Sequence, residues 1–311
     1  MSGEFEQMTE TDGSQLLQSF SNAVTELAEA VSPSVVSVNS GKRSGTGMVW
    51  SGEGLIVTAS HVIGRSTAPA VVLSDGRTLT AKVMGADPFA DVALLRVEAA
   101  GLAPVDQGTA DGIRVGQFVL ALASAAGSKA SATSGIVTSR RRSIRGFWGA
   151  MIEDAVISDA KLNPGYSGGA LVDASGKLLG MNVAYFAGRG VAVSVDSLKD
   201  TVYKISKDGK VKKGFLGVVV EPIELPDELA SSSAVGQTEG LLVRSVEPGS
   251  PARIAGVVIG DIILRLGDAK ASDQYELYRA LSADVVGKPL PLDVLRTEKV
   301  TELKVTPKEA E

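Results

Sequence analysis

The 311-residue chain contains no cysteine and only one histidine, His61. Without cysteine it can form no disulfide, no thiolate zinc site and no cysteine nucleophile, and this absence suits reducing and oxidising compartments equally. One imidazole and no thiolate are also too few nitrogen and sulfur ligands for an ordinary zinc site. We therefore expect no metal centre.

Long apolar runs and a strong net charge are also missing. No run approaches the ~18 apolar residues of a membrane span, so membrane association is not indicated. The 31 basic and 36 acidic residues leave a net charge of −5, which has the wrong sign for a nucleic-acid partner. The start, MSGEFEQMTETDG, is acidic and polar, unlike a secretory leader. Either the protein is cytosolic or a leader or anchor has been removed.

What the chain does contain points to a globular protein of about two domains. Apolar residues make up 44% and charged residues 22%, and 35 glycines punctuate short β-prone runs. This spacing predicts antiparallel barrels or sandwiches. An amphipathic helix over residues 14–31 packs its apolar stripe on its own domain or against another subunit. The expected order is a disordered tail (1–14), a β-rich domain with an N-terminal helix (15–206), a basic linker (207–213) and a mixed α+β domain (214–308).

The stretch SDAKLNPGYSGGALVD (158–173) surrounds Ser167 with turn-forming residues. Pro164 and Gly165 precede the serine, and two glycines follow it, so the backbone can turn tightly on both sides. Such a turn can aim backbone N–H groups at one point, as in an oxyanion hole. The alternative is a glycine-rich hairpin with an incidental serine.

A serine hydroxyl needs a base to become a strong nucleophile, and His61 is the one imidazole available. Asp91 directly precedes the apolar run VALLRV, where a carboxylate is costly to bury unless it accepts hydrogen bonds. Accepting the imidazole N–H would satisfy Asp91 and fix the tautomer of His61. Asp87 and Asp159 are competing carboxylates, and Asp87 can instead cap the loop at Pro88.

The order His61, Asp91, Ser167 within TASHV, DVALL and NPGYSGGAL resembles the HtrA/Deg family of chymotrypsin-fold serine proteases. The resemblance runs from about residue 20 to 308 and includes GTGMVWSGEGLIVTASHVI, SGIVTSRRR and GRGVAVSVDSL. It implies a mostly β fold, with two β-barrels and a triad at their junction, followed by one PDZ domain. It also implies His61 as general base and acid, Asp91 as its orienter and Ser167 as nucleophile. The N–H groups of Gly165 and Ser167, on either side of Tyr166, would form the oxyanion hole.

Three residues depart from the pattern of the family. Tyr166 replaces Asn or Asp, and Ser60 replaces Asn; we expect the site to tolerate both. Arg189 replaces an apolar residue of the substrate pocket. Pointing inward, it would disfavour basic substrate side chains and admit acidic ones; pointing outward, it would leave Leu162 and Phe186 to line a small-to-medium apolar pocket. We favour the outward orientation because an unpaired buried guanidinium is expensive.

The basic stretch Arg140–Trp148 (RRRSIRGFW) has three interpretations. It is a solvated loop with a tucked tryptophan, or an activation loop that contacts other subunits or the PDZ domain, as the resemblance implies. The third is a site for acidic lipid or substrate, which its few arginines disfavour.

The C-terminal domain resembles a PDZ domain because GFLGVVV, EPGSPARIAGVVIGDIILRLG and a helix over 271–283 occur in that order. An extended peptide would add as a strand beside residues 215–219, with backbone N–H groups receiving its terminal carboxylate. Strand residues alternate in direction, so some candidates belong to the core. The predicted peptide-binding residues are Phe215, Leu216, Gly217, Val218, Tyr275 and Tyr278.

The resemblance implies an ATP-independent serine endopeptidase of protein quality control that needs no cofactor. It would hydrolyse unfolded or damaged proteins through an acyl-enzyme at Ser167, with the PDZ domain binding apolar C-termini. Assembly into a homotrimer through the segment around Phe20, or into larger cages, is implied, as is a location in the periplasm or cell envelope. Two alternatives stay open: a latent or inactive protease that serves as a peptide-binding scaffold or chaperone, and a narrow processing protease.

Overall fold

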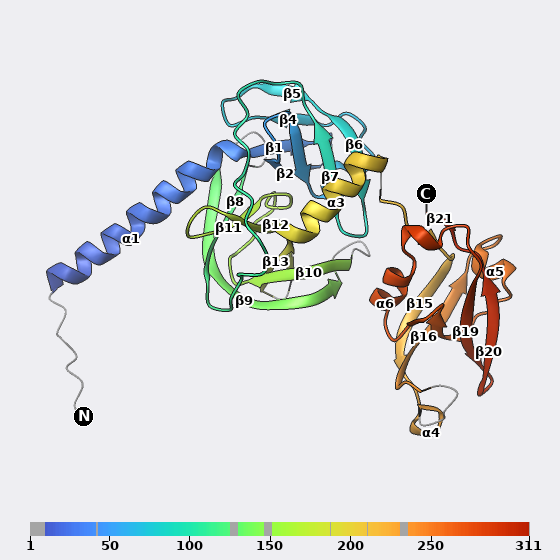
Figure 1. Cartoon of the computed structure of the whole chain (residues 1–311). Coiled ribbons are helices and arrows are strands. Elements are labelled where there is room, and N and C mark those ends of the chain that lie inside the picture. The colour runs from blue at the N-terminus through green and yellow to red at the C-terminus, as the bar shows by residue number, and fades with distance from the viewer. Residues whose placement is uncertain are drawn as a thin grey trace, which may run out of the picture. The chain divides into compact units, whose positions relative to one another are not determined.

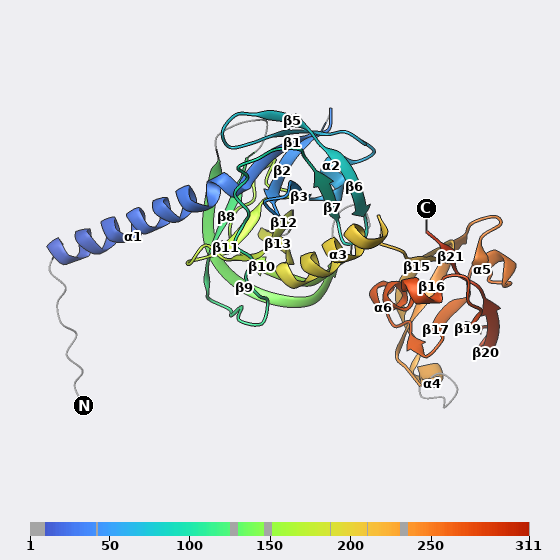
Figure 2. The same ribbon diagram turned by 45° about the horizontal axis from the view of Figure 1, so that its top comes forward.

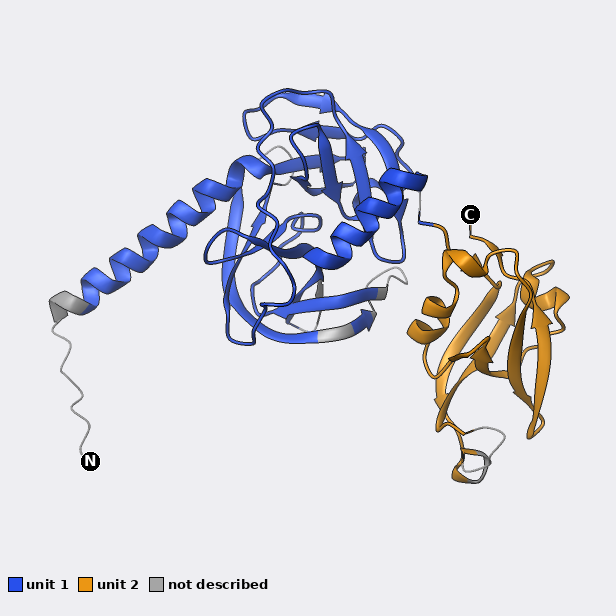
Figure 3. Ribbon diagram, viewed as in Figure 1, with its two compact units in different colours: residues 1–211 blue, residues 212–311 orange. Residues whose placement is uncertain are grey.

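The computed structural model describes residues 10–41, 43–124, 130–145, 151–186, 188–209, 211–230 and 236–310. The chain divides into two compact units, residues 1–211 and residues 212–311 (Figure 3). Strands dominate both units, which confirms the predicted mostly β fold class.

The first unit opens with helix α1 (Glu10–Val31), although the sequence predicted a disordered tail through residue 14. Residues 10–14 therefore belong to this helix. The C-terminal half of α1 packs on the core of the unit. The N-terminal half extends away from the sheets (Figures 1 and 2).

The first half of this unit is an antiparallel seven-stranded sheet in the order β5-β4-β1-β2-β3-β7-β6 (Figure 1). Its strands are β1 (Val35–Asn39), β2 (Ser44–Val49), β3 (Leu55–Thr58), β4 (Ala70–Val72), β5 (Thr78–Thr80), β6 (Lys82–Asp87) and β7 (Val92–Arg96). The one-turn helix α2 (Ser60–Ile63) follows β3 almost directly and carries His61. Strand β7 is the predicted buried run, and its first four residues are fully buried.

The second half is a closed antiparallel barrel of order β10-β13-β12-β11-β8-β9. Its strands are β8 (Phe118–Ala123), β9 (Ser131–Arg145), β10 (Met151–Ser158), β11 (Ala170–Asp173), β12 (Leu178–Phe186) and β13 (Arg189–Ser194). Because β9 continues through Arg145, the first six residues of the basic stretch are strand rather than the solvated loop that was one interpretation. The rest of that stretch, Gly146 to Trp148, lies outside the described residues.

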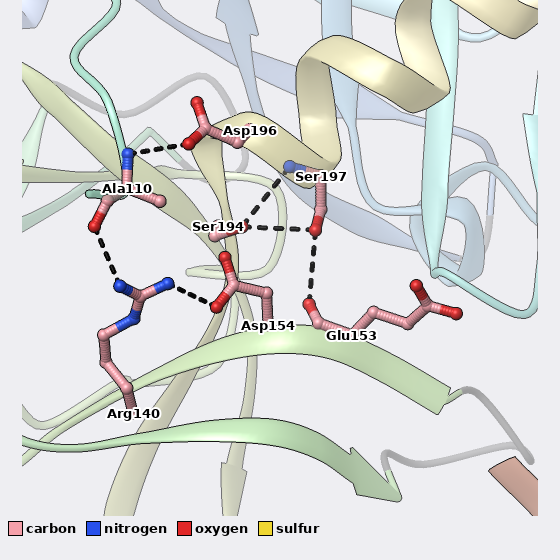
Figure 4. A network of polar contacts seen from close by, with 7 residues as sticks. All are labelled: Ala110, Arg140, Glu153, Asp154, Ser194, Asp196 and Ser197. Carbon is pink, nitrogen blue, oxygen red and sulfur yellow. Dashed lines mark hydrogen bonds and ion pairs between the residues drawn. The ribbon is translucent and has the colours of Figure 1, made fainter. Parts of the chain in front are cut away.

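Helix α3 (Val195–Asp208) closes the unit. Its first turn is bonded to Ala110, in the chain segment that precedes β8 (Figure 4). Asp196 accepts the backbone N–H of Ala110 at 2.9 Å, and the carbonyl of Ala110 accepts Nη1 of Arg140 at 2.9 Å. Arg140, on β9, also pairs with Asp154 on β10. These bonds connect β9 and β10 of the barrel, through Ala110, to the start of α3.

The second unit is built on a six-stranded antiparallel sheet, whose main order is β15-β16-β17-β19-β20, with β18 beside β17 and a separate β14-β21 pair. The strands are β14 (Gly214–Phe215), β15 (Val218–Glu224), β16 (Glu239–Val246), β17 (Ile262–Leu266), β18 (Ala269–Lys270), β19 (Leu290–Arg296), β20 (Lys299–Val305) and β21 (Lys308–Glu309). Its helices are α4 (Asp227–Ala230), α5 (Pro251–Ile254) and α6 (Gln274–Ala280).

Two elements of this unit differ from their predicted extent. The run GFLGVVV, predicted as one strand, is divided into β14 and β15 because Gly217 has a φ of +77° and cannot continue a strand. The helix predicted over 271–283 starts only at Gln274. Ala271 donates its N–H to the carbonyl of Leu264 on β17, and the Asp273 side chain caps the helix at Glu276.

Candidate active site

His61 and Asp91 form a hydrogen-bonded pair in the first unit. Nδ1 of His61 lies 2.6 Å from Oδ2 of Asp91, and Oδ1 of Asp91 accepts the backbone N–H of His61 at 2.9 Å. Because a carboxylate accepts from Nδ1, that nitrogen carries the proton and Nε2 is left as the acceptor. The tautomer is therefore the one that a general base requires.

The backbone of Asp91 is strained at this point. Its φ is +56°, in the left-handed region that a non-glycine residue seldom adopts, and such strain gathers at functional sites. The carbonyl of Asp91 accepts the N–H of Ser60 at 3.1 Å, so the backbone carbonyl and the carboxylate of Asp91 both hold the α2 turn. The turn thus places His61 beside a nearly buried carboxylate.

The two competing carboxylates are engaged elsewhere. Oδ1 of Asp87 accepts the N–H groups of Phe89 and Ala90, which is the loop-capping role expected as its alternative. Oδ1 of Asp159, just after β10, accepts the N–H of Ile136 on β9 at 2.7 Å. Of the three predicted carboxylates, Asp91 is the one that contacts the imidazole.

The loop that carries Ser167 lies against β2. The carbonyl of Ser167 accepts the N–H of Thr46 at 2.9 Å. A Cβ atom on Gly45 would lie 3.0 Å from that same carbonyl oxygen and 2.6 Å from Cγ2 of Val62. Since Val62 directly follows His61, the serine loop and the histidine turn meet on the two sides of Gly45.

The hydroxyl of Ser167 donates to the carbonyl of Val183 on β12, with 3.3 Å between the two oxygens. Within the described part of the chain, no hydrogen bond joins this hydroxyl to His61. A hydroxyl carries one proton, so Ser167 must leave Val183 before it can donate to Nε2.

The segment just before Ser167 forms the turn that the sequence predicted. The N–H of Tyr166 donates to the carbonyl of Asn163 at 3.1 Å, and Gly165 has a φ of +95°. Pro164 before a glycine of positive φ is typical of a type II turn. Among the described residues, the N–H groups of Gly165 and Ser167 donate no hydrogen bond. Both are therefore available to an anionic oxygen.

The second unit has a comparable pair of N–H groups between β14 and β15. The carbonyl of Leu216 accepts the N–H of Ala252 at 2.9 Å, and the carbonyl of Gly217 accepts the N–H of Glu247 at 2.8 Å. Across the described ranges, the N–H groups of Leu216 and Gly217 themselves donate none. Consecutive N–H groups in such a turn can receive a carboxylate.

The side chains predicted to bind the peptide differ in exposure. Leu216 belongs to the core of the unit, so its predicted contribution can come only from its backbone. Tyr275 is nearly buried, whereas Phe215, Val218 and Tyr278 are partly exposed. The ammonium of Lys213 lies 3.8 Å from the centroid of the Tyr278 ring, in a cation–π contact.

Over the part of the chain that the structure describes, no group of three or more His, Asp or Glu side chains is arranged to hold a metal ion. Within that same part, no helix is both long and apolar enough to cross a membrane.

Comparison with known proteins decides the family. The family model for the trypsin-like peptidase domain matches residues 45–181, and the model for the PDZ domain matches residues 214–306. A solved structure described as HtrA-type protease AlgW with a tripeptide is 31% identical, with a TM-score of 0.73 and coverage of 94% of this chain and 97% of that chain. The chain belongs to the HtrA family of serine proteases.

Two curated HtrA relatives are longer than this chain. The chloroplastic Protease Do-like 1 of Arabidopsis thaliana is 35% identical over 283 residues, which cover 85% of this chain and 63% of the relative. A probable periplasmic serine endoprotease, DegP-like, of Chlamydia trachomatis is 33% identical over 271 residues, which cover 84% of this chain and 53% of the relative. The chain thus spans between about half and two thirds of the length of these relatives.

The family assignment confirms the predicted resemblance and the predicted pairing of a trypsin-like domain with one PDZ domain. The predicted domain limits and the roles of the individual site residues stay predictions.

The HtrA substrate pocket was predicted from Leu162, Phe186 and Arg189. Leu162 is nearly buried, and its Cγ would lie 3.2 Å from a Cβ placed on Gly190. Arg189 is exposed at the start of β13, and the side chain of Phe186 lies outside the described residues. The roles of all three stay predictions.

Tyr166, the departure from the HtrA pattern beside the nucleophile, is buried in the core of the barrel together with Leu162 and Leu171. Burial raises the pKa of the phenol, and a hydrogen bond with Thr133 lowers it by less. The phenol therefore stays protonated, and its ring anchors the loop between the two unpaired N–H groups.

Sequence reasoning missed two residues that hold the nucleophile loop, Gly45 and Thr46. Both stand in the GTG of GTGMVW, which was noted only as a landmark of the resemblance. A glycine on each side of a threonine in a buried strand is a signal of close backbone approach.

Proposed function

We propose that this chain is a serine endopeptidase in which Ser167 is the nucleophile, His61 the general base and acid, and Asp91 the residue that orients His61. The observation that carries the proposal is the 2.6 Å bond from Nδ1 of His61, the chain's sole imidazole, to Asp91. It leaves Nε2 as the acceptor, on the turn that meets the Ser167 loop at Gly45.

The reaction follows from these groups. Nε2 of His61 takes the hydroxyl proton while Oγ of Ser167 attacks the carbonyl carbon of the scissile peptide bond. The oxygen of the tetrahedral intermediate, now negative, accepts the N–H groups of Gly165 and Ser167. His61 returns its proton to the leaving amine, and an acyl-enzyme remains on Ser167. Water, deprotonated by His61, then hydrolyses that ester and restores the hydroxyl.

The proposed substrates are unfolded or damaged polypeptides, and the PDZ domain receives apolar C-termini. A PDZ domain whose Leu216 and Gly217 N–H groups are unpaired suits a terminal carboxylate. The related AlgW structures are described as holding a tripeptide and a decapeptide. The preference for unfolded substrates is tested by comparing the digestion of unfolded casein with that of folded globular proteins of similar size. Equal cleavage of both would contradict it.

The oligomer we propose is a homotrimer joined through α1, with larger assemblies of trimers as an extension. Leu16, Leu17 and Phe20 are 63%, 71% and 57% exposed on this helix. The ring of Phe20 meets that of Phe118 edge-on at 5.9 Å, and Phe118 pairs with the exposed Ile136. An apolar patch of this kind favours association. Sedimentation of the Leu17→Glu variant should show loss of the trimer, and unchanged mass would oppose this interface.

The proposed location is the periplasm or another cell-envelope compartment, since the DegP-like relatives are described as periplasmic. Fractionation of the source cells tests it, and recovery with cytosolic markers would count against it.

A latent protease is the second candidate, and the bond from Ser167 to Val183 favours it. In that state the triad completes only when a bound substrate draws the hydroxyl to His61. A lag in casein cleavage that disappears when the substrate is preincubated with the enzyme would support latency, and linear progress curves would oppose it.

A further inference from the structure

Thr46, in the middle of β2, is fully buried and bonded through every polar group it has. Its hydroxyl donates to the carbonyl of Gly165 at 2.7 Å and accepts the N–H of Ser124 at 2.9 Å. Its N–H donates to the carbonyl of Ser167, and its carbonyl accepts the hydroxyl of Thr58 at 2.6 Å. One side chain therefore joins three segments that are far apart in the sequence.

These bonds fix the peptide planes between the two unpaired N–H groups. Thr46 holds the carbonyls of Gly165 and Ser167, and the carbonyl of Tyr166 accepts the N–H of Gly169 at 2.9 Å. The N–H of Tyr166 is held by Asn163. From Gly165 to Ser167, among the described residues, every carbonyl is thus bonded and two N–H groups are not.

The bond to Gly165 is the one in this set that comes from a side chain. Without the hydroxyl of Thr46, the carbonyl of Gly165 would lose its donor in a partly buried site, where an unpaired acceptor costs free energy. Rotation of the peptide could restore a partner, but it would also reorient the adjoining N–H groups. An oxyanion hole works only where its donors are already aimed.

We propose that Thr46 is a positioning residue that keeps the oxyanion hole formed in the absence of substrate, acting through the carbonyl of Gly165. This inference rests on the proposed protease function. It gives the hydroxyl of Thr46 a role in the chemical step and none in substrate binding.

The test compares Thr46→Val, which keeps the shape and removes the donor, with Thr46→Ser, which keeps the donor. In the full chain we expect Thr46→Val to lower kcat on an unfolded peptide by about 10²-fold, the size of a misplacement effect, with little change in KM. Thr46→Ser should retain most of the activity. Affinity for a peptide boronate, which forms a tetrahedral anion on serine, should fall with kcat in the valine variant.

Thr201→Val is the matched control, because Thr201 is a buried threonine of α3 outside the proposed site. A valine variant as active as the wild type, or a serine variant as impaired as the valine variant, would overturn the inference. Amide hydrogen exchange over residues 162–169 gives a readout that needs no activity. We expect faster exchange in Thr46→Val than in Thr46→Ser, and equal exchange rates in the two variants would overturn the inference. An inactive wild type would instead contradict the proposed function, and the exchange comparison would still test the role of Thr46.

Discussion

Nδ1 of His61, on α2, lies 2.6 Å from Oδ2 of Asp91, which stands thirty positions later in the turn before β7. The carboxylate fixes the protonated nitrogen, so that Nε2 is left as an acceptor. We predict that Asp91→Asn lowers kcat by about 10⁴-fold, because an asparagine amide can donate to Nδ1 and stabilise the wrong tautomer. Steady-state peptide hydrolysis measures the change.

Asp87→Asn serves as the control for this substitution. The asparagine oxygen can still accept the N–H groups of Phe89 and Ala90, so the loop and the activity should persist. Equal losses in the two variants would mean that a carboxylate near residue 90 acts through folding rather than through His61.

Gly45 separates the histidine turn from the serine loop. A Cβ there would lie 2.6 Å from Cγ2 of Val62 and 3.0 Å from the Ser167 carbonyl oxygen, so Gly45→Ala must push the two apart. We expect a loss of about 10²-fold in kcat/KM, as a displacement of about 1 Å produces. Gly112→Ala, where a Cβ meets nothing within 4 Å, should leave hydrolysis unchanged.

Gly217 gives the PDZ domain its proposed carboxylate-binding turn. With a φ of +77° and a would-be Cβ only 2.2 Å from Cβ of Ser250, Gly217→Ala should abolish binding of an apolar C-terminal peptide. Gly249→Ala is the control, since it has a similar φ of +72° and open space around it. Fluorescence anisotropy with a labelled peptide reports both, and binding that survives Gly217→Ala would place the carboxylate elsewhere.

Asp261 is a fully buried carboxylate of the PDZ unit that accepts two bonds from Arg296, each 2.8 Å, and one from the N–H of Val258. Its hydrogen bond raises the pKa of Arg296. Arg296→Ala leaves the buried charge with one partner, and we expect the unit to lose about 2–4 kcal/mol of its free energy of unfolding.

Hydrogen exchange of β17 in the full chain measures that loss. Arg244→Ala is the control, because its pair with Glu221 is more than half exposed on both sides and such pairs contribute about 0–1 kcal/mol. Similar protection in the two variants would argue that the buried pair adds no net stability.

Much of the site could be predicted because its chemistry depends on rare residues in distinctive surroundings. A chain with one imidazole has one candidate histidine base, and the glycines around Ser167 indicate where the backbone turns. Gly165 indeed has the positive φ that the Pro-Gly pair predicts. The acidic partner was harder, because Asp87, Asp91 and Asp159 differ in the atoms they reach rather than in type.

Other features depend on contacts that no local pattern encodes. Thr46 reads as an ordinary strand residue, and its role appears only when β2 and the Ser167 loop, more than a hundred residues apart, are brought together. Similarly, the alternating pattern of its strand made Leu216 a candidate pocket residue, but its side chain lies in the core of the PDZ domain. The early start of α1, at Glu10, falls in an acidic, polar stretch that composition alone assigned to a tail.

The most direct measurement of the central claim is labelling by a fluorophosphonate probe, followed by mapping of the modified residue. The account predicts that the wild-type chain is labelled on Ser167, that Ser167→Ala is not labelled, and that His61→Ala is labelled far more slowly. A wild-type chain that the probe leaves unmodified, or labelling that survives Ser167→Ala, would contradict it.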